Sequence, residues 1–160
     1  MMRCCHDLET TELRVATGQT CRMPTFPKDA STHTKVANAP RQLGMDPGDF
    51  ERASRGLIAQ HPTGVIQGAW GTAWDINKYD FIKQGSTNPD TVNPSLWRQA
   101  QLNNIHGLFE VAPKVWQARG YDISNITFIE GETGWIVIDP LTIEGCARDC
   151  LALANAQLGE

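Results

Sequence analysis

The fold is decided by residues 107–140, which read GLFEVAPKVWQARGYDISNITFIEGETGWIVIDP. Four short apolar segments alternate there with residues that favour turns, such as Ala112-Pro113, Gly120 and Asp139-Pro140. The EGETG run that begins at Glu130 lies between two apolar segments and predicts a hairpin with a longer loop. The WIVI run at 135–138 has no polar alternation, which predicts a strand buried on both faces. We therefore expect four short strands with covering layers.

A helix is predicted from Ile143 to Leu158. Thr142 can cap it, Glu144 lies in its first turn, where the helix dipole favours negative charge, and Gly159 can end it. Its apolar residues recur at helical spacing and form one stripe: Ile143, Cys146, Ala147, Cys150, Leu151, Ala154 and Leu158. A strand covered by a helix normally continues into a parallel strand, and no residues remain for one, so we expect an incomplete α/β sheet.

Composition indicates an ordinary globular chain. Of its 160 residues, 41% are hydrophobic and 20% are charged, and the formal net charge is −4. The basic residues are scattered, which argues against a nucleic-acid partner. No apolar run approaches the ~20 residues that span a bilayer, and the first 25 residues lack the apolar core of a secretory signal. We therefore expect no membrane span and, by default, a cytoplasmic location.

The cysteines and histidines do not predict a metal site. Zinc-ligand residue types occur together at Cys4-Cys5-His6 and Cys21, but this spacing matches no common zinc knuckle. Cys146 and Cys150 have apolar neighbours and are interpreted as core thiols. The remaining histidines are isolated from one another, and we interpret them as structural or solvated: His33, His61 and His106.

Upstream of residue 107 the signals are local. Residues 1–27 have little periodicity and are interpreted as a disordered arm. Asp46-Pro47 and Asn93-Pro94 each combine a cap with a first-turn proline, which predicts one helix ending before Gly56 and another ending before Gly107. Residues 57–59 and 65–66 are predicted to pair as a small hairpin. Trp97 and Arg98 could serve a partner surface, but we favour docking of their helix on its own domain.

Several segments of this sequence resemble, in the same order, segments of the alkyl sulfatases that hydrolyse dodecyl sulfate. These enzymes belong to the metallo-β-lactamase superfamily. The resemblance is carried by PDTVNPSLWRQAQLN at 89–103, QARGYD at 117–122, NITFIEG at 125–131 and TGWIVIDPL at 133–141. It covers roughly residues 28–160.

The resemblance implies the fold class α/β (α+β): an incomplete metallo-β-lactamase αββα sandwich with a mixed helix and coil N-terminal extension. The domains would be an arm at 1–27, the extension at 28–106, and the first strands and helix of a truncated metallo-β-lactamase domain at 107–160. The family binds two zinc ions through a His-x-His-x-Asp-His loop, and no such loop occurs in this chain. We therefore carry over no catalytic residue and no metal ligand.

The resemblance places Asp139 beside the metal loop as a structural neighbour, with Tyr121, Asp122 and Asn125 in a loop that could border the same cleft. From the residues alone, Asp139-Pro140 is a common way to turn a chain after a strand. Asp139 and Asn125 are thus the candidate site residues, in a structural role.

Three functional hypotheses remain. The first is a fragment of a zinc-dependent alkyl sulfatase, inactive alone, whose full-length relatives would hydrolyse primary alkyl sulfate esters such as dodecyl sulfate to alcohol and sulfate. The second is a non-catalytic interaction module, in which an exposed sheet edge pairs with a complementary fragment or forms a homodimer. The third is a thiol-based redox or metal protein that uses Cys4, Cys5 and Cys21.

Overall fold

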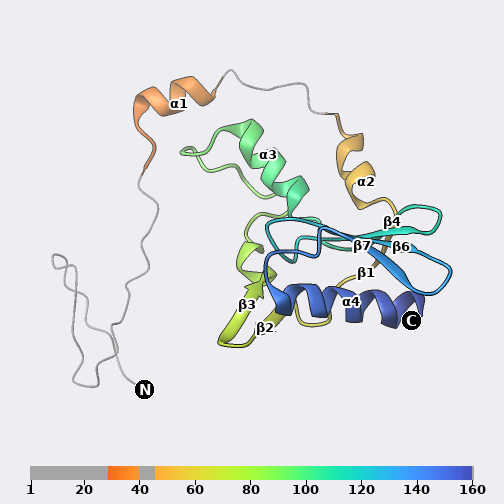
Figure 1. The fold of residues 1–160 in the computed structure, drawn as a ribbon. Coiled ribbons are helices and arrows are strands. Elements are labelled where there is room, and N and C mark those ends of the chain that lie inside the picture. The colour runs from red at the N-terminus through yellow and green to blue at the C-terminus, as the bar shows by residue number, and fades with distance from the viewer. Residues whose placement is uncertain (1–28, 40–45, 160) are drawn as a thin grey trace, which may run out of the picture.

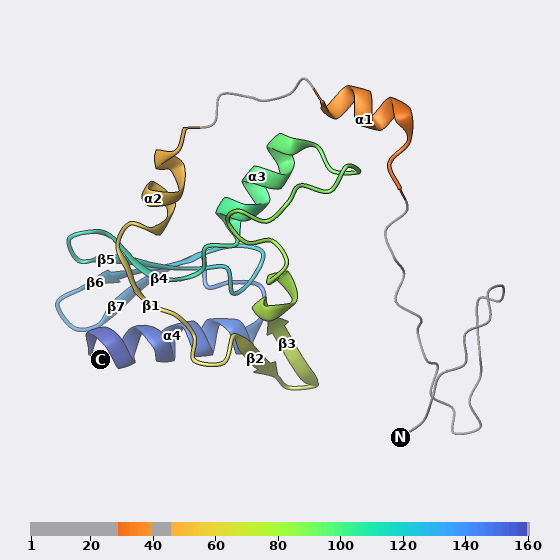
Figure 2. The same ribbon diagram turned by 180° about the vertical axis from the view of Figure 1, so that it is seen from behind.

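The computed structural model describes residues 29–39 and 46–159, so the arm expected at 1–27 lies outside the described residues (Figures 1 and 2). The helices are α1 (Thr32–Asn38), α2 (Gly48–Ser54), the 3₁₀ helix η1 (Ile76–Tyr79), α3 (Pro94–Asn103) and α4 (Glu144–Leu158). The strands are β1 (Leu57–Ala59), β2 (Val65–Gly68), β3 (Gly71–Asp75), β4 (Gly107–Ala112), β5 (Val115–Arg119), β6 (Ile126–Glu130) and β7 (Trp135–Ile138). The expected mixed α/β class is confirmed.

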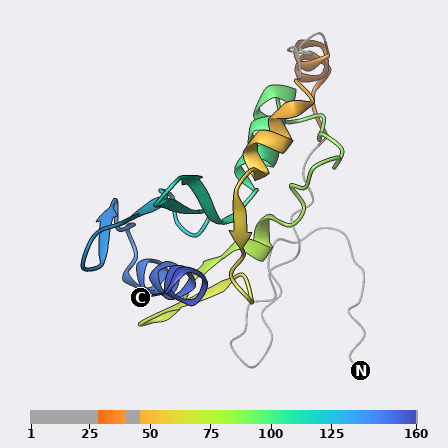
Figure 3. The same ribbon diagram turned by 90° about the vertical axis from the view of Figure 1, so that its right-hand side faces the viewer.

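A five-stranded antiparallel sheet, ordered β1-β4-β5-β6-β7, contains the four strands expected between residues 107 and 139. Helix α4 lies across one face of this sheet (Figure 3). The core between them combines aliphatic, aromatic and thiol side chains: Ile66, Leu108, Ala118, Tyr121, Ile126, Phe128, Cys146, Cys150, Leu153 and Ala154. Leu151, which the helical stripe placed in the core, is 38% exposed, whereas Leu153 is buried in its place.

The expected hairpin of residues 57–59 with 65–66 is wrong. Strand β1 pairs with β4, with Leu57 opposite Phe109, and β2 pairs with β3 in a separate two-stranded sheet. The intervening loop is turned by a hydrogen bond from the Gly64 backbone N–H to His61 Nδ1 (3.1 Å), with Gly64 at φ +68°. Because this loop directs β1 and β2 into different sheets, β1 does not pair with β2. It pairs instead with β4, about 50 residues further along the chain.

The expectation that residues 135–138 are buried on both faces is also wrong. Strand β7 is an edge strand with β6 as its single neighbour, and Ile136, Val137 and Ile138 are 57%, 41% and 53% exposed. Continuous apolar runs occur in doubly covered strands, but of this run only Trp135 is partly buried against the core, where its indole N–H donates to Asn155 of α4. The apolar run is therefore present without the layers that would bury it.

The face of the sheet opposite α4 has no covering helix over β5, β6 and β7 (Figure 3). Phe128 packs toward α4, and side chains alternate along each strand, so the register assigns the neighbouring positions to the other side. We call this side the open face, and it consists of Val115, Gln117, Arg119, Thr127, Ile129, Ile136 and Ile138.

Helix α3 begins where its cap-plus-proline signal places it, with Asn93 as the cap, whereas α2 begins one residue later than predicted, at Gly48 with Pro47 in the cap position. Asp46 Oδ1 accepts a hydrogen bond from the Gly48 backbone N–H (2.8 Å), and Asn93 Oδ1 accepts one from the Ser95 N–H (3.0 Å). Trp97 is 8% exposed and donates its indole N–H to the Ser86 carbonyl (3.2 Å), which supports docking of α3 on its own domain.

Gly145 marks a close crossing of α4 over β2. A Cβ at this position would lie 2.6 Å from the Gln67 carbonyl oxygen, which is backbone and cannot swing away. In an exposed helix, Gly→Ala stabilises by about 1 kcal/mol. Here we expect Gly145→Ala to reduce the free energy of unfolding by about 1–3 kcal/mol, because α4 must shift off the sheet.

Urea unfolding of Gly145→Ala checks this expectation. Ala156→Gly, at an exposed position of the same helix, is the control. It measures the difference in helix propensity between alanine and glycine within α4 and should lower the free energy of unfolding by about 1 kcal/mol. A Gly145→Ala variant as stable as the unsubstituted chain would contradict the close crossing.

Candidate functional site

Two loops meet at one edge of the five-stranded sheet, residues 120–125 after β5 and residues 139–143 after β7. Strands β5 and β7 are both antiparallel to β6, so their carboxyl ends lie at the same edge. The carboxylate of Asp122, which is 6% exposed, joins the two loops. This edge is where the candidate site residues gather.

Asp122 accepts four hydrogen bonds. The donors are the Ile123 N–H (2.6 Å), the Thr142 hydroxyl (2.6 Å), the Thr142 N–H (2.9 Å) and the Ile143 N–H (3.0 Å). Burial by itself raises the pKa of Asp122, but these hydrogen bonds outweigh it and leave the pKa below its ordinary value. Asp122 is therefore a carboxylate at neutral pH whose oxygens are engaged in holding the loops.

The Asp122 contacts correct the expected cap of α4. The helix starts at Glu144, and Thr142 makes no capping hydrogen bond to it. The Thr142 hydroxyl donates to Asp122 instead, and the same carboxylate accepts the backbone N–H groups of Thr142 and Ile143 just before the helix. A side chain about 20 residues away in the sequence thus positions the start of α4, which the local sequence did not predict.

Asp139 and Asn125 lie at this edge of the sheet. Both are exposed, and Asp139 Oδ1 accepts a hydrogen bond from the Ser124 hydroxyl (3.3 Å), which links the two loops again. Asp139 and Leu141 have φ values of +52° and +69°, and for a residue as bulky as leucine this conformation is strained. Strain of this kind concentrates at functional loops. Whether the two residues border a metal loop stays a prediction.

A hollow of about 510 Å³ opens beside this edge, between α2, α3 and the loop after β5. Arg119, Asp122 and Asn125 line it together with residues of the two helices. On its far wall, Asp49 is bonded to Arg98 (2.6 Å) and also to Arg52. The acidic groups of the hollow are therefore already partnered.

His61 and Tyr121 form a buried junction between the β1–β2 loop and the core. The His61 backbone N–H donates to the Tyr121 hydroxyl (2.7 Å), and burial raises the pKa of Tyr121 to about 12. His61 Nδ1 accepts from the Gly64 N–H, which leaves the ring proton on Nε2, 3.5 Å from Asp149 Oδ2. His106 Nδ1 lies 3.0 Å from the Asn104 carbonyl, so it donates there. Both histidines have structural partners.

The described residues do not form a metal centre. No group of three or more His, Cys, Asp or Glu side chains comes together within 29–39 and 46–159. Cys146 and Cys150 are buried, and burial raises their pKa values to about 11 and about 12, so both are unreactive core thiols. Cys4, Cys5 and Cys21 lie outside the described residues. The zinc ions implied by the family resemblance thus have no ligand set here.

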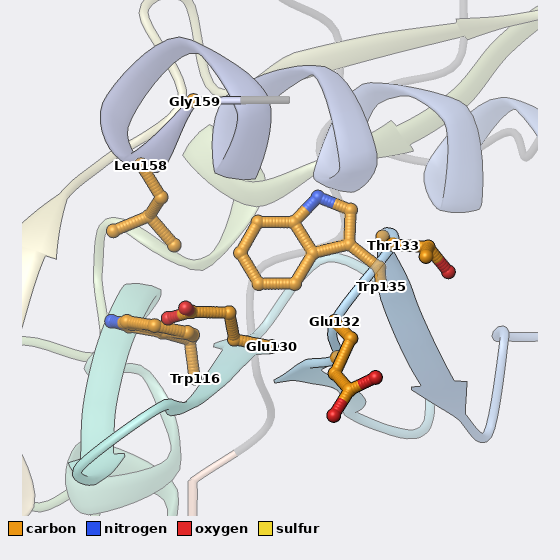
Figure 4. Close-up of a pocket in the computed structure, with 9 residues that line it drawn as sticks. Trp116, Glu130, Glu132, Thr133, Trp135, Leu158 and Gly159 are labelled. Carbon is orange, nitrogen blue, oxygen red and sulfur yellow. The ribbon is translucent and has the colours of Figure 1, made fainter.

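A second hollow, of about 550 Å³, lies where the loop between β6 and β7 approaches the end of α4 (Figure 4). The rings of Trp116 and Trp135 meet edge to face with centroids 5.5 Å apart, and the Trp135 indole N–H donates to Asn155 (2.9 Å). Leu158 closes one side, and Glu132 points away from the helix. Glu130 also lines the hollow, but its carboxylate is paired with Lys114 (3.1 Å).

Among the helices that the structure describes, none has the length and apolarity needed to cross a membrane.

Comparison with known proteins finds similarity to alkylsulfatases. No protein-family model matches the chain. It is 46% identical over 130 residues to a linear primary-alkylsulfatase of Pseudomonas sp. and 49% identical over 129 residues to an (R)-specific secondary-alkylsulfatase of Pseudomonas sp., in each case 79% of this chain and 19% of the relative. An alkyl/aryl-sulfatase of Saccharomyces cerevisiae is 44% identical over 132 residues, 80% of this chain and 20% of the relative.

A solved structure agrees with these relatives. The inverting sec-alkylsulfatase Pisa1 from Pseudomonas sp. superposes with a TM-score of 0.76 at 47% identity, covering 83% of this chain and 21% of that one. About four fifths of this chain is therefore similar in sequence and in fold to one segment of the alkylsulfatases. The chain spans about a fifth of the length of the relatives it matches.

Proposed function

We propose that this chain forms part of an alkyl sulfatase that hydrolyses primary alkyl sulfate esters, such as dodecyl sulfate, to alcohol and sulfate. The observation that carries the proposal is identity of 44–49% over about 130 residues to three alkylsulfatases. Because primary and secondary alkylsulfatases match about equally well, the preference for primary esters rests on the sequence resemblance. A cytoplasmic location is also part of the proposal, as the default drawn from the sequence, in which neither a membrane span nor a secretory signal was recognised.

In this proposal the chain contributes scaffold rather than reacting groups. Asp122 holds the loops after β5 and β7 together, which positions Asp139 and Asn125 at the sheet edge. In the assembled enzyme those two residues would lie beside a loop that binds two zinc ions, as structural neighbours. The residues described here do not fit zinc, so we derive no step of hydrolysis through the metal.

The alternative function is a non-catalytic interaction module, as a homodimer or with a complementary fragment. The exposed apolar residues of β7 favour it, because an uncovered edge strand is a template for strand addition. Light scattering distinguishes the two states: a folded monomer argues against a self-associating module, and a stable dimer supports one.

The purified chain is expected to release no sulfate from dodecyl sulfate in the presence of zinc, because it holds no set of metal ligands among its described residues. Ion chromatography of released sulfate checks this, with the full-length Pseudomonas linear primary-alkylsulfatase as the positive control. Zinc-dependent release by this chain alone would contradict the scaffold role. Dodecyl and 2-octyl sulfate, compared on an enzyme assembled with this chain, test the preference for primary esters.

A further inference from the structure

The open face combines an apolar surface with one unpaired cation. Its aliphatic members lie on β5, β6 and β7, and Ile136 and Ile138 are more than half exposed. Arg119, at the end of β5, supplies the single charge of the set. Because acidic residues are absent from the face, its charge is uncompensated.

The Arg119 guanidinium is held in a fixed position. Its Nε donates to Gln117 Oε1 (2.7 Å), and Gln117 Nε2 donates in turn to the Thr127 hydroxyl (3.2 Å), so a polar chain crosses from β5 to β6. The guanidinium carbon lies 4.5 Å from the centroid of the Phe109 ring, which is fully buried. Arginine stacked and bonded in this way presents its terminal N–H groups in a preset orientation.

Those terminal groups have no acceptor on the described part of the chain. None of the ion pairs within 29–39 and 46–159 includes Arg119, and its one side-chain hydrogen bond uses Nε. The two carboxylates that line the same hollow are engaged elsewhere, Asp49 by two arginines and Asp122 by four donors. Partial burial already lowers the pKa of Arg119, and complete burial without an anion would cost far more.

Two observations indicate what covers the face. The relatives are about five times as long as the matched segment, so much polypeptide is available to pack on it. A second copy of this chain is an unfavourable partner for the open face. Two such faces packed together would bring two Arg119 side chains into one interface, and no residue of either face carries a carboxylate to pair with them.

We propose that the open face docks a polypeptide segment from the other four fifths of an alkylsulfatase, and that Arg119 is its anchor, pairing with a carboxylate that this segment brings. The inference rests on the proposed function for the identity of the partner. The apolar residues around Arg119 would supply the buried area, and the fork of the guanidinium would fix the register of the segment.

The test is co-expression of the tagged chain with the part of the Pseudomonas linear primary-alkylsulfatase that lies outside the matched segment. We expect a complex that survives affinity purification and gel filtration. Arg119→Glu should weaken the apparent affinity by about tenfold or more, because it sets two carboxylates against each other, and Arg119→Lys by less. Arg55→Glu, at an exposed position outside the face, is the matched control and should bind as the unsubstituted chain does.

A second measurement uses the unsubstituted chain, in case Arg119→Glu fails to fold. Phenylglyoxal modifies accessible guanidinium groups, so Arg119 should react in the free chain and be protected in the complex, as read by peptide mass spectrometry. Absence of a complex, normal binding by Arg119→Glu, or equal modification of Arg119 in the free and bound states would each overturn the proposal. A complex that forms but releases no sulfate from dodecyl sulfate would overturn the proposed function and leave the docking surface standing.

Discussion

Replacing Asp122 by alanine is expected to lower the free energy of unfolding by about 4 kcal/mol. The side chain is 6% exposed and accepts four hydrogen bonds, three of them from backbone N–H groups. Removing it leaves these donors without an acceptor at a site that water reaches poorly, and it frees the loop after β5 from the start of α4. Urea unfolding followed by tryptophan fluorescence measures the loss.

Two further variants isolate the reason for that loss. Asp122→Asn keeps one oxygen acceptor and should cost roughly half as much, since hydrogen bonds to a charged group are about twice as strong. Asp139→Asn, at the same sheet edge but exposed, should stay within about 0.5 kcal/mol, because asparagine tolerates its φ of +52°. An Asp122→Ala variant within 1 kcal/mol of the unsubstituted chain would refute the role given to this carboxylate.

The same carboxylate predicts a dependence of stability on pH. The pKa of Asp122 is lower in the folded chain than the ordinary value of 3.8, so the unfolded chain binds the proton more readily. Its contribution is therefore complete above pH 3.8 and is lost as pH falls through the lowered pKa. The difference in unfolding free energy between the unsubstituted chain and Asp122→Asn should be constant near neutrality and shrink in acid. A difference that grows on acidification would reverse the assigned sign.

Local chemistry in the sequence predicts much of this fold, and non-local contacts account for what it misses. The four strands between residues 107 and 139 follow from apolar runs separated by turn residues, and α3 follows from Asn93-Pro94. In contrast, the partner of β1 is chosen by contact with β4, and the start of α4 by contact with Asp122. Neither partner lies within the window of residues that a local pattern can read.

The candidate site shows the same division. The family resemblance placed Asp139 and Asn125 beside a metal loop, and that stays a prediction; the structure links the loops that carry them through the hydrogen bond from Ser124 to Asp139. Asp122, named beforehand only as a loop residue, is the buried group that joins the loops. The sequence feature that pointed to Asp122 was GYD at 120–122, directly after a predicted strand. This feature does not by itself distinguish an aspartate exposed in a turn from a buried one. Arg119 was missed as a site residue because its unpaired charge is visible only once its neighbours are known.

The second large effect is expected for Phe128→Ala, which should cost about 3–5 kcal/mol. Phe128 is fully buried on the α4 side of the sheet and packs edge to face with Trp135, the ring centroids being 6.0 Å apart. Truncation leaves a cavity between β6 and α4 that the surrounding strands can fill only in part. Urea unfolding again provides the measurement.

Ile136→Ala on the neighbouring strand is the matched control. Ile136 pairs with Ile129 on the open face and is 57% exposed, so its truncation should cost less than about 1 kcal/mol in the isolated chain. If the two substitutions cost the same, the sheet is not covered on one side only, and the open face is wrongly assigned. If the open face is a docking surface, Ile136→Ala should weaken binding of the partner although it barely changes the stability of the free chain. The reason is that the Ile136 side chain is removed from water only in the complex.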